Sequence, residues 1–199
     1  MTVDLDAIAA NWRALKALAA GAECAAVVKA DAYGLGLAPI AVRLSREGAR
    51  TFFVATVDEG ETLRAILPSP PVYVLNGFQP GEAGRLAQSD LRPVLNSYAQ
   101  FAEWKALASR PPAALQIDTG MQRTGFSEAD LQLIADEAPD FGDVEIALLM
   151  SHLACADEPP HPKNGDQLAR FRAALERFPK RPASLAASAG ALLGQRYLF

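Results

Sequence analysis

A single lysine stands where a buried strand is expected to end. The apolar run Ala25–Lys29 is followed by the segment Ala30–Gly36, which contains two glycines. A buried lysine is costly unless its amine has a partner or a task. Removal of water favours the neutral amine, which is the form that attacks a carbonyl carbon and makes a Schiff base. The position alone also fits a lysine whose stem packs while its amine reaches solvent.

Three other polar groups follow later apolar runs. Arg123 lies in the segment 118–125 (DTGMQRTG), and its planar guanidinium suits a carboxylate or a phenolate. His152 could stack on a flat cofactor ring or join a hydrogen-bond network. Ser188 precedes a helical stretch, where a hydroxyl beside free amides can bind phosphate. With Lys29 these groups suit pyridoxal phosphate, whereas the plain alternatives are a surface arginine, a satisfied core histidine and an N-cap serine.

The elements that must position these groups alternate along the chain. Seven short apolar runs show little alternation, which indicates strands that are buried on both faces. These runs are Ala25–Lys29, Thr51–Ala55, Val72–Asn76, Leu91–Leu95, Ala113–Ile117, Glu145–Met150 and Ala183–Ala187. Amphipathic stretches lie between them, so the pattern predicts an α/β fold with a parallel sheet. Active sites of such folds lie at the carboxyl ends of the strands, where all four groups are expected.

Capping residues mark the expected starts of several helices. Ser97 is expected to cap one helix, and the pairs Ser127–Asp130 and Asn164–Gln167 are expected to form capping boxes at two others. Seven strand–helix units approach the eight of a closed (β/α)8 barrel, which usually needs about 250 residues. We therefore expect an incomplete TIM-type (β/α)8 barrel in a single domain over residues 1–199. An open doubly wound sheet is the alternative.

Composition narrows the class of function. The net charge is −4 and no cluster of Lys and Arg stands out, which argues against nucleic acid as a partner. No apolar run approaches the roughly 18–20 residues that span a bilayer, and the first residues are unlike a secretory signal. Cys24 and Cys155 lack metal-ligand spacing, so we expect no metal site, no disulfide framework and a cytoplasmic location.

Four segments together resemble the alanine racemase family. Lys29–Gly36 (KADAYGLG) is similar to the family's KADAYGHG-type segment, and residues 118–125 are similar to its DTGM-x-R-x-G segment. The segments Ser151–Ala154 (SHLA) and Ala187–Gly190 (ASAG) resemble its SH-F/L-A and NSAG segments. The order and spacing match over the whole length. The first two segments are specific and the last two are supportive.

The resemblance implies a role for each candidate residue. Lys29 would hold pyridoxal phosphate covalently and act as the base for the D-enantiomer. Tyr33 and Ser188 would contact the cofactor phosphate. Arg123 would face the phenolic oxygen of the cofactor and the carboxylate of the substrate. His152 would pack against the pyridine ring and belong to its hydrogen-bond network.

Three residues depart from the family pattern. Gln116 stands where many members have a lysine, often carbamylated, that orients the arginine, so an amide or a small anion must orient Arg123 here. Leu35 replaces the usual histidine of the first segment. Ala187 replaces the asparagine before Ser188, which removes one side-chain contact near the cofactor.

The resemblance also implies an activity and a larger protein. We expect interconversion of L- and D-alanine for peptidoglycan synthesis by a homodimer, although a racemase for serine or for a broader set of amino acids fits as well. The family's last barrel strand and its C-terminal β-domain, which supplies the second base, are not matched, so we expect an N-terminal fragment with low activity alone. The alternatives are a single-domain, non-enzymatic protein that binds pyridoxal phosphate and a structural α/β domain without cofactor.

Overall fold

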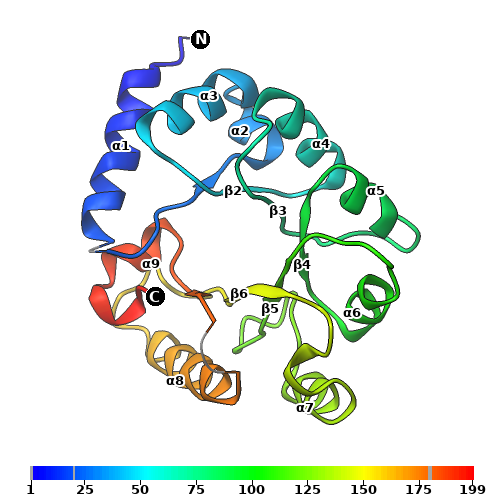
Figure 1. Ribbon diagram of the computed structural model, residues 1–199. Helices are drawn as coiled ribbons and strands as arrows, with labels where there is room; N and C mark the ends of the chain where they lie inside the picture. Colours follow the sequence, from blue (N-terminus) through cyan, green and yellow to red (C-terminus); the bar gives the residue numbers. More distant parts are fainter. Residues whose placement is uncertain (1, 20, 179–180) are drawn as a thin grey trace. The chain divides into compact units, whose positions relative to one another are not determined.

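Strands and helices alternate along the chain in the computed structural model, which describes residues 2–19, 21–178 and 181–199 (Figure 1). The chain divides into two units. Unit 1 contains the residues through Pro93 together with Ser109–Pro111, and unit 2 contains Val94–Ala108 and Pro112–Phe199. The seven expected strands are all present in the described part of the chain, and every pairing is parallel.

Unit 1 is built on the first strands, which follow one another in chain order. Its elements are α1 (Leu5–Leu18), β1 (Ala26–Val27), α2 (Lys29–Gly34), α3 (Leu37–Glu47), β2 (Phe52–Val54), α4 (Val57–Ile66), β3 (Val72–Val74), α5 (Ala83–Gln88) and the start of β4 (Arg92–Leu95). β1 pairs with β2, β2 with β3, and β3 with β4. Helices α3 and α4 lie on one side of β2 and β3 (Figure 1).

The core of unit 1 forms because its strands are apolar on both faces. All three residues of β2 and all three of β3 are buried, as their continuous apolar sequences predict. Helix α3 buries Ile40, Ala41 and Leu44, one face of a helical repeat. It ends at Gly48, whose φ of +101° is a left-handed cap that favours glycine. The strands therefore lie in this apolar core, and polar residues can be placed where each strand ends.

Unit 2 repeats the same plan. Its elements are the end of β4, α6 (Tyr98–Lys105), β5 (Ala113–Gln116), α7 (Glu128–Glu137), the short helix η1 (Pro139–Phe141), β6 (Ile146–Met150), α8 (Pro162–Arg177), β7 (Ala183–Ser184), α9 (Ser188–Leu192) and the short helix η2 (Gln195–Tyr197). β4 pairs with β5, β5 with β6, and β6 with β7. Aromatic side chains fill its core, and the rings of Phe141 and Phe178 lie 4.6 Å apart between centroids.

Two of the three expected helix caps are correct. The Ser97 side chain caps α6, and Ser127 with Asp130 forms a complete capping box at α7. The expectation for Asn164 and Gln167 is wrong, because α8 already begins at Pro162 with His161 as its N-cap. Proline suits the first turn because its missing N–H would be unpaired there in any case. Asn164 and Gln167 therefore lie inside the helix.

No helix in the described ranges combines the length and the apolar character that crossing a membrane requires. Within the same ranges no group of His, Cys, Asp and Glu is arranged to hold a metal ion.

Candidate active site

Lys29 lies two residues after β1, at the carboxyl end of the strand. Val28, which is 1% exposed, still donates its backbone N–H to the Phe53 carbonyl of the neighbouring strand at 2.9 Å. Lys29 is half-buried and opens α2. The expected position of this lysine after the first strand is confirmed, but the expected burial of that strand on both faces is wrong, because Val27 is 43% exposed.

The residues after Lys29 adopt an unusual backbone. Ala30, Asp31, Ala32 and Tyr33 all have φ between 52° and 58°, which is the left-handed helical region. None of them is glycine, and each such residue costs about 1–2 kcal/mol. Strain of roughly 4–8 kcal/mol in this turn requires contacts that hold it. The turn buries Ala32 at 3% exposure and leaves the Tyr33 side chain 63% exposed.

Glu59 of α4 holds the start of this turn. One carboxylate oxygen accepts the backbone N–H of Ala30 at 2.9 Å, and the other accepts that of Ala55, at the end of β2, at 2.7 Å. A charged acceptor makes both bonds stronger than bonds between neutral groups. Glu59 therefore ties the chain next to Lys29 to the end of the neighbouring strand.

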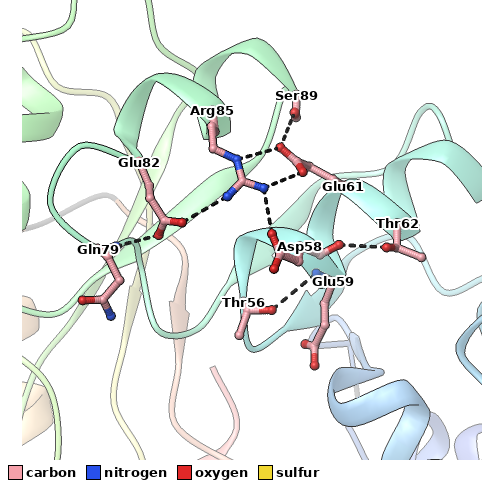
Figure 2. A network of polar contacts seen from close by, with 9 residues as sticks. All are labelled: Thr56, Asp58, Glu59, Glu61, Thr62, Gln79, Glu82, Arg85 and Ser89. Carbon is pink, nitrogen blue, oxygen red and sulfur yellow. Dashed lines mark hydrogen bonds and ion pairs between the residues drawn. The ribbon is translucent and has the colours of Figure 1, made fainter.

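The other acids near Glu59 have a different task. Figure 2 shows Asp58, Glu61 and Glu82 converging on Arg85, while the Glu59 side chain points away from that network. Arg85 contacts Asp58 and Glu61 at 2.7 Å and Glu82 at 3.1 Å. Hydrogen bonds to Glu61 first and then to Asp58 raise the pKa of the Arg85 guanidinium above its ordinary value. Glu61 thus provides a matched comparison for Glu59 on the same helix.

The end of the turn is closed by Asp31. Its side chain accepts the backbone N–H of Leu37 at 2.6 Å, and its carbonyl accepts that of Gly36 at 2.9 Å. Asp31 therefore connects the left-handed turn to the first residue of α3. The sequence placed Asp31 in the family segment but gave no sign of this bond.

Arg123 lies in the loop that joins β5 to α7 in unit 2. The Asp118 side chain accepts the backbone N–H groups of Gly120 at 2.9 Å and Gln122 at 3.0 Å, which shapes the start of the loop. The loop then returns to the strand, because Phe126 donates its N–H to the Gln116 carbonyl at 2.8 Å. The side chain of Arg123 is exposed.

Gly125 permits the return of this loop. Its φ is +114°, and a Cβ atom there would lie 2.8 Å from the Asp118 backbone nitrogen and 3.0 Å from the Gln116 carbonyl oxygen. Only glycine fits, which explains the last position of the DTGM-x-R-x-G segment. Gln116 is 8% exposed, and the described structure records no hydrogen bond from its amide to Arg123, so the expectation that an amide orients Arg123 stays a prediction.

His152 and Ser188 follow the next two strands of unit 2. His152 comes two residues after β6, is half-buried, and accepts a hydrogen bond at its carbonyl from the Gln167 side chain at 2.9 Å. Ser188 is exposed and is the first residue of α9, with Ala187 as the N-cap. The plain alternative of an N-cap serine is therefore wrong. Because β5, β6 and β7 are parallel neighbours, Arg123, His152 and Ser188 all belong to loops at the same edge of this sheet.

A buried polar network joins two of these loops. It consists of Thr119, Ser151 and Gln167, whose side chains are 2%, 3% and 1% exposed. Sequence reasoning missed it, because Gln167 was assigned to a helix cap. The available signal was the helical spacing of Asn164, Gln167 and Phe171, which places two amides on the apolar face of α8.

Comparison with known proteins decides the family. The family model described as "Alanine racemase, N-terminal domain" matches residues 3–199. The chain belongs to this family. It is 46% identical to a catabolic alanine racemase of Mesorhizobium japonicum, over 99% of this chain and 53% of that protein. It is 49% identical to an alanine racemase of Methylobacterium nodulans, over 98% of this chain and 54% of that protein.

Solved structures of family members share the fold. The crystal structure of alanine racemase from Bartonella henselae, with covalently bound pyridoxal phosphate, matches with a TM-score of 0.95 and 40% identity, over 99% of this chain and 59% of that chain. Biosynthetic alanine racemase from Pseudomonas aeruginosa matches with a TM-score of 0.90 and 32% identity, over 98% of this chain and 55% of that chain. The expected α/β fold of the incomplete TIM-barrel type is thereby confirmed. The chain spans about half the length of the curated relatives it matches.

Proposed function

We propose that this alanine racemase-family chain binds pyridoxal phosphate through Lys29 and takes part in the racemisation of alanine. The observation that carries the proposal is Lys29 itself, which follows β1 after Val28, is half-buried and opens the KADAYG segment. Relatives that are 46% and 49% identical are alanine racemases, and the Bartonella henselae enzyme holds pyridoxal phosphate covalently.

The chain offers donors that fit each part of this cofactor. An aldehyde requires an amine, which Lys29 supplies. A phosphate requires hydrogen-bond donors, and the hydroxyl-bearing side chains of Tyr33 and Ser188 are both exposed. The first backbone N–H of α9 that bonds within the helix is that of Ala191, which leaves the preceding amides for other acceptors.

The proposed roles rest on the family resemblance, and the chemistry of the side chains suits them. When bound, pyridoxal phosphate supplies a conjugated ring that spreads the negative charge left at Cα after its proton departs. We assign to the Lys29 amine the removal and return of that proton on the face that serves the D-enantiomer. The Arg123 guanidinium binds the substrate carboxylate and faces the phenolic oxygen. The His152 imidazole packs against the pyridine ring, while Tyr33 and Ser188 donate to the phosphate.

Exchange of the Cα proton of alanine tests this proposal directly. The protein is incubated with pyridoxal phosphate and D-alanine in D2O, because Lys29 is assigned to the face that serves the D-enantiomer, and the loss of the Cα proton signal is followed by NMR. Exchange requires proton transfer but not inversion, so it reports on Lys29 even where racemisation is slow. Lys29→Ala at the same cofactor concentration is the control, because free pyridoxal phosphate exchanges this proton slowly without protein.

The outcomes separate the proposed function from its alternatives. Exchange well above the Lys29→Ala control, together with formation of L-alanine, supports an alanine racemase. Cofactor binding without exchange favours the non-enzymatic protein that binds pyridoxal phosphate. Exchange of serine that is faster than that of alanine would move the substrate to the hydroxy amino acid.

The same family resemblance supports three statements about the whole protein. We propose that it forms a homodimer, acts in the cytoplasm and provides D-alanine for peptidoglycan. Light scattering on the purified protein tests the dimer, and a mass of one chain would contradict it. Fractionation of the cells that make the protein tests its location.

A further inference from the structure

The Gln167 side chain is the polar centre of the face that α8 turns toward the loops of unit 2. It is 1% exposed, and a buried amide is costly unless its donors and acceptor are paired. Its Nε2 group donates to the Thr119 hydroxyl at 3.1 Å and to the His152 carbonyl at 2.9 Å. Its Oε1 atom accepts the backbone N–H of Ala154 at 2.8 Å.

These partners fix the orientation of the amide. The His152 carbonyl can only accept and the Ala154 N–H can only donate, so exchanging the nitrogen and the oxygen of Gln167 would break both bonds. The side chain therefore holds the backbone on both sides of Leu153. One residue of α8 therefore sets the backbone path of residues 152–154, and with it the point on the backbone from which the His152 side chain extends.

The network continues from Gln167 to the loop that carries Arg123. The Ser151 hydroxyl donates to the Ile117 carbonyl at 2.7 Å, which uses its only proton. In its 2.8 Å contact with Thr119, Ser151 must therefore accept. The hydrogen bonds are therefore all donated in one direction: Gln167 donates to Thr119, Thr119 to Ser151, and Ser151 to the Ile117 carbonyl. Such a one-way series strengthens each of its bonds and has a single arrangement.

A second contact from α8 supports the same loop. Arg170, one helical turn after Gln167, donates to the Thr119 carbonyl at 3.3 Å. The side chain and the carbonyl of Thr119 are thus both held from α8. Thr119 begins the loop whose next residues lead to Arg123.

Asn164 shows that burial of an amide in α8 does not by itself connect to these loops. It lies about one turn before Gln167 and is also 1% exposed. Its Nδ2 group donates to the carbonyls of Cys155 at 2.9 Å and Glu158 at 3.0 Å, which lie in the later part of the loop before α8. Asn164 therefore also donates to backbone carbonyls from the same helix, but its recorded side-chain hydrogen bonds do not reach Thr119 or His152, and its Oδ1 atom is buried without a hydrogen-bond partner among the described residues.

We propose that Gln167 is a positioning residue that sets the orientation of His152 and of the loop bearing Arg123 for the proposed cofactor and substrate. The inference rests on the proposed function for its effect on catalysis, but its effect on His152 is independent of any cofactor. Helix α8 carries none of the motif residues, but under this proposal it controls two of the loops that carry them.

The test compares Gln167→Met with Asn164→Ala in the full chain. The chain contains two histidines, His152 and His161, so 15N-labelled histidine gives two sets of imidazole signals, assigned with a His161→Gln variant. Without cofactor, we expect Gln167→Met to move the His152 signals and leave those of His161 in place. Asn164→Ala should do the reverse, because the Asn164 side chain donates to the Glu158 carbonyl, which also accepts the backbone N–H of His161 at 2.9 Å.

The second readout is the exchange of the Cα proton. We expect Gln167→Met to lower the exchange rate at least tenfold. Asn164→Ala should stay within about twofold of the unchanged protein when each protein is measured the same number of degrees below its own melting temperature. Thr119→Val, which removes both hydrogen bonds of the Thr119 hydroxyl with almost no change in side-chain volume, covers the case in which Gln167→Met does not fold. It should lower exchange several-fold.

Two results would overturn the proposal: His152 signals that stay in place in Gln167→Met, or equal losses of exchange in the Gln167 and Asn164 variants. For a Gln167→Met chain that does not fold, unchanged exchange in Thr119→Val overturns it. If the unchanged protein shows no exchange at all, the proposed function fails. The histidine spectra then still decide whether Gln167 positions His152.

Discussion

The left-handed turn after Lys29 predicts an unusual response to glycine. Ala30 has φ 52° and ψ 51°, its side chain is exposed, and its backbone N–H bonds to Glu59. Ala30→Gly removes only the Cβ atom and keeps that bond. Ala10, which is exposed in the middle of α1, provides the matched substitution in an ordinary right-handed helix.

The magnitudes follow from the two backbone conformations. Removing Cβ from a left-handed residue relieves about 1–2 kcal/mol of strain, and the added freedom of glycine in the unfolded chain costs roughly 0.5–1 kcal/mol. Ala30→Gly should therefore raise the free energy of unfolding by about 0.5–1 kcal/mol. Ala10→Gly should lower it by about 0.5–1 kcal/mol, since only the entropy cost acts there. For a chain of this size, each change corresponds to about 1–4 °C in melting temperature.

Thermal and urea denaturation of both variants beside the unchanged chain measure the difference. The expected result is a melting temperature above that of the unchanged chain for Ala30→Gly and below it for Ala10→Gly. Equal destabilisation by the two substitutions would show that Ala30 is not left-handed in solution. The account of how the turn is held next to Lys29 would then be wrong.

Three further predictions concern the neighbourhood of the same motifs. Glu59→Gln should lower the free energy of unfolding by about 1–3 kcal/mol in urea denaturation, because an amide nitrogen would face a backbone N–H. Glu61→Gln, which loses only a half-exposed ion pair, should lower it by less than about 1 kcal/mol. A larger loss in Glu61→Gln than in Glu59→Gln would refute the role of Glu59. Gly125→Ala should lower the free energy of unfolding by about 1–3 kcal/mol from its backbone conformation alone. Gly84→Ala, in α5 with open space around it, should raise that free energy or leave it unchanged in the same denaturation experiment. Burial raises the pKa of the Cys24 thiol, so its alkylation by iodoacetamide at pH 8 should be slower than that of a free cysteine and should approach it as the pH rises; an equal rate at pH 8 would contradict this burial.

The regular part of the fold was predictable from the sequence because it depends on burial. Residues 52–55 (FFVA) are apolar at every position, and strands buried on both faces need that pattern. The capping box of Ser127 and Asp130 was equally clear, since both residues act within one turn. Local chemistry and apolar runs together were sufficient for all seven strands.

The parts that were missed depend on contacts between distant residues. Four non-glycine residues in a left-handed turn have no compositional signal, and their conformation is held by Glu59, which lies 29 positions from Ala30. The Asn164–Gln167 pair matches the pattern of a capping box, but the helix begins earlier at Pro162, and Gln167 serves a network reaching back 48 positions to Thr119. Neither the turn nor the network follows from local propensity.

The central claim, that Lys29 anchors the cofactor, is tested most directly by chemical trapping. The protein is mixed with pyridoxal phosphate and reduced with borohydride, and its peptides are identified by mass spectrometry. The account predicts a pyridoxyl group on the peptide that contains Lys29, and its loss in Lys29→Ala with the other lysines unmodified at the same cofactor concentration. A protein that carries no adduct, or carries it at other lysines with Lys29 unmodified, would contradict the account.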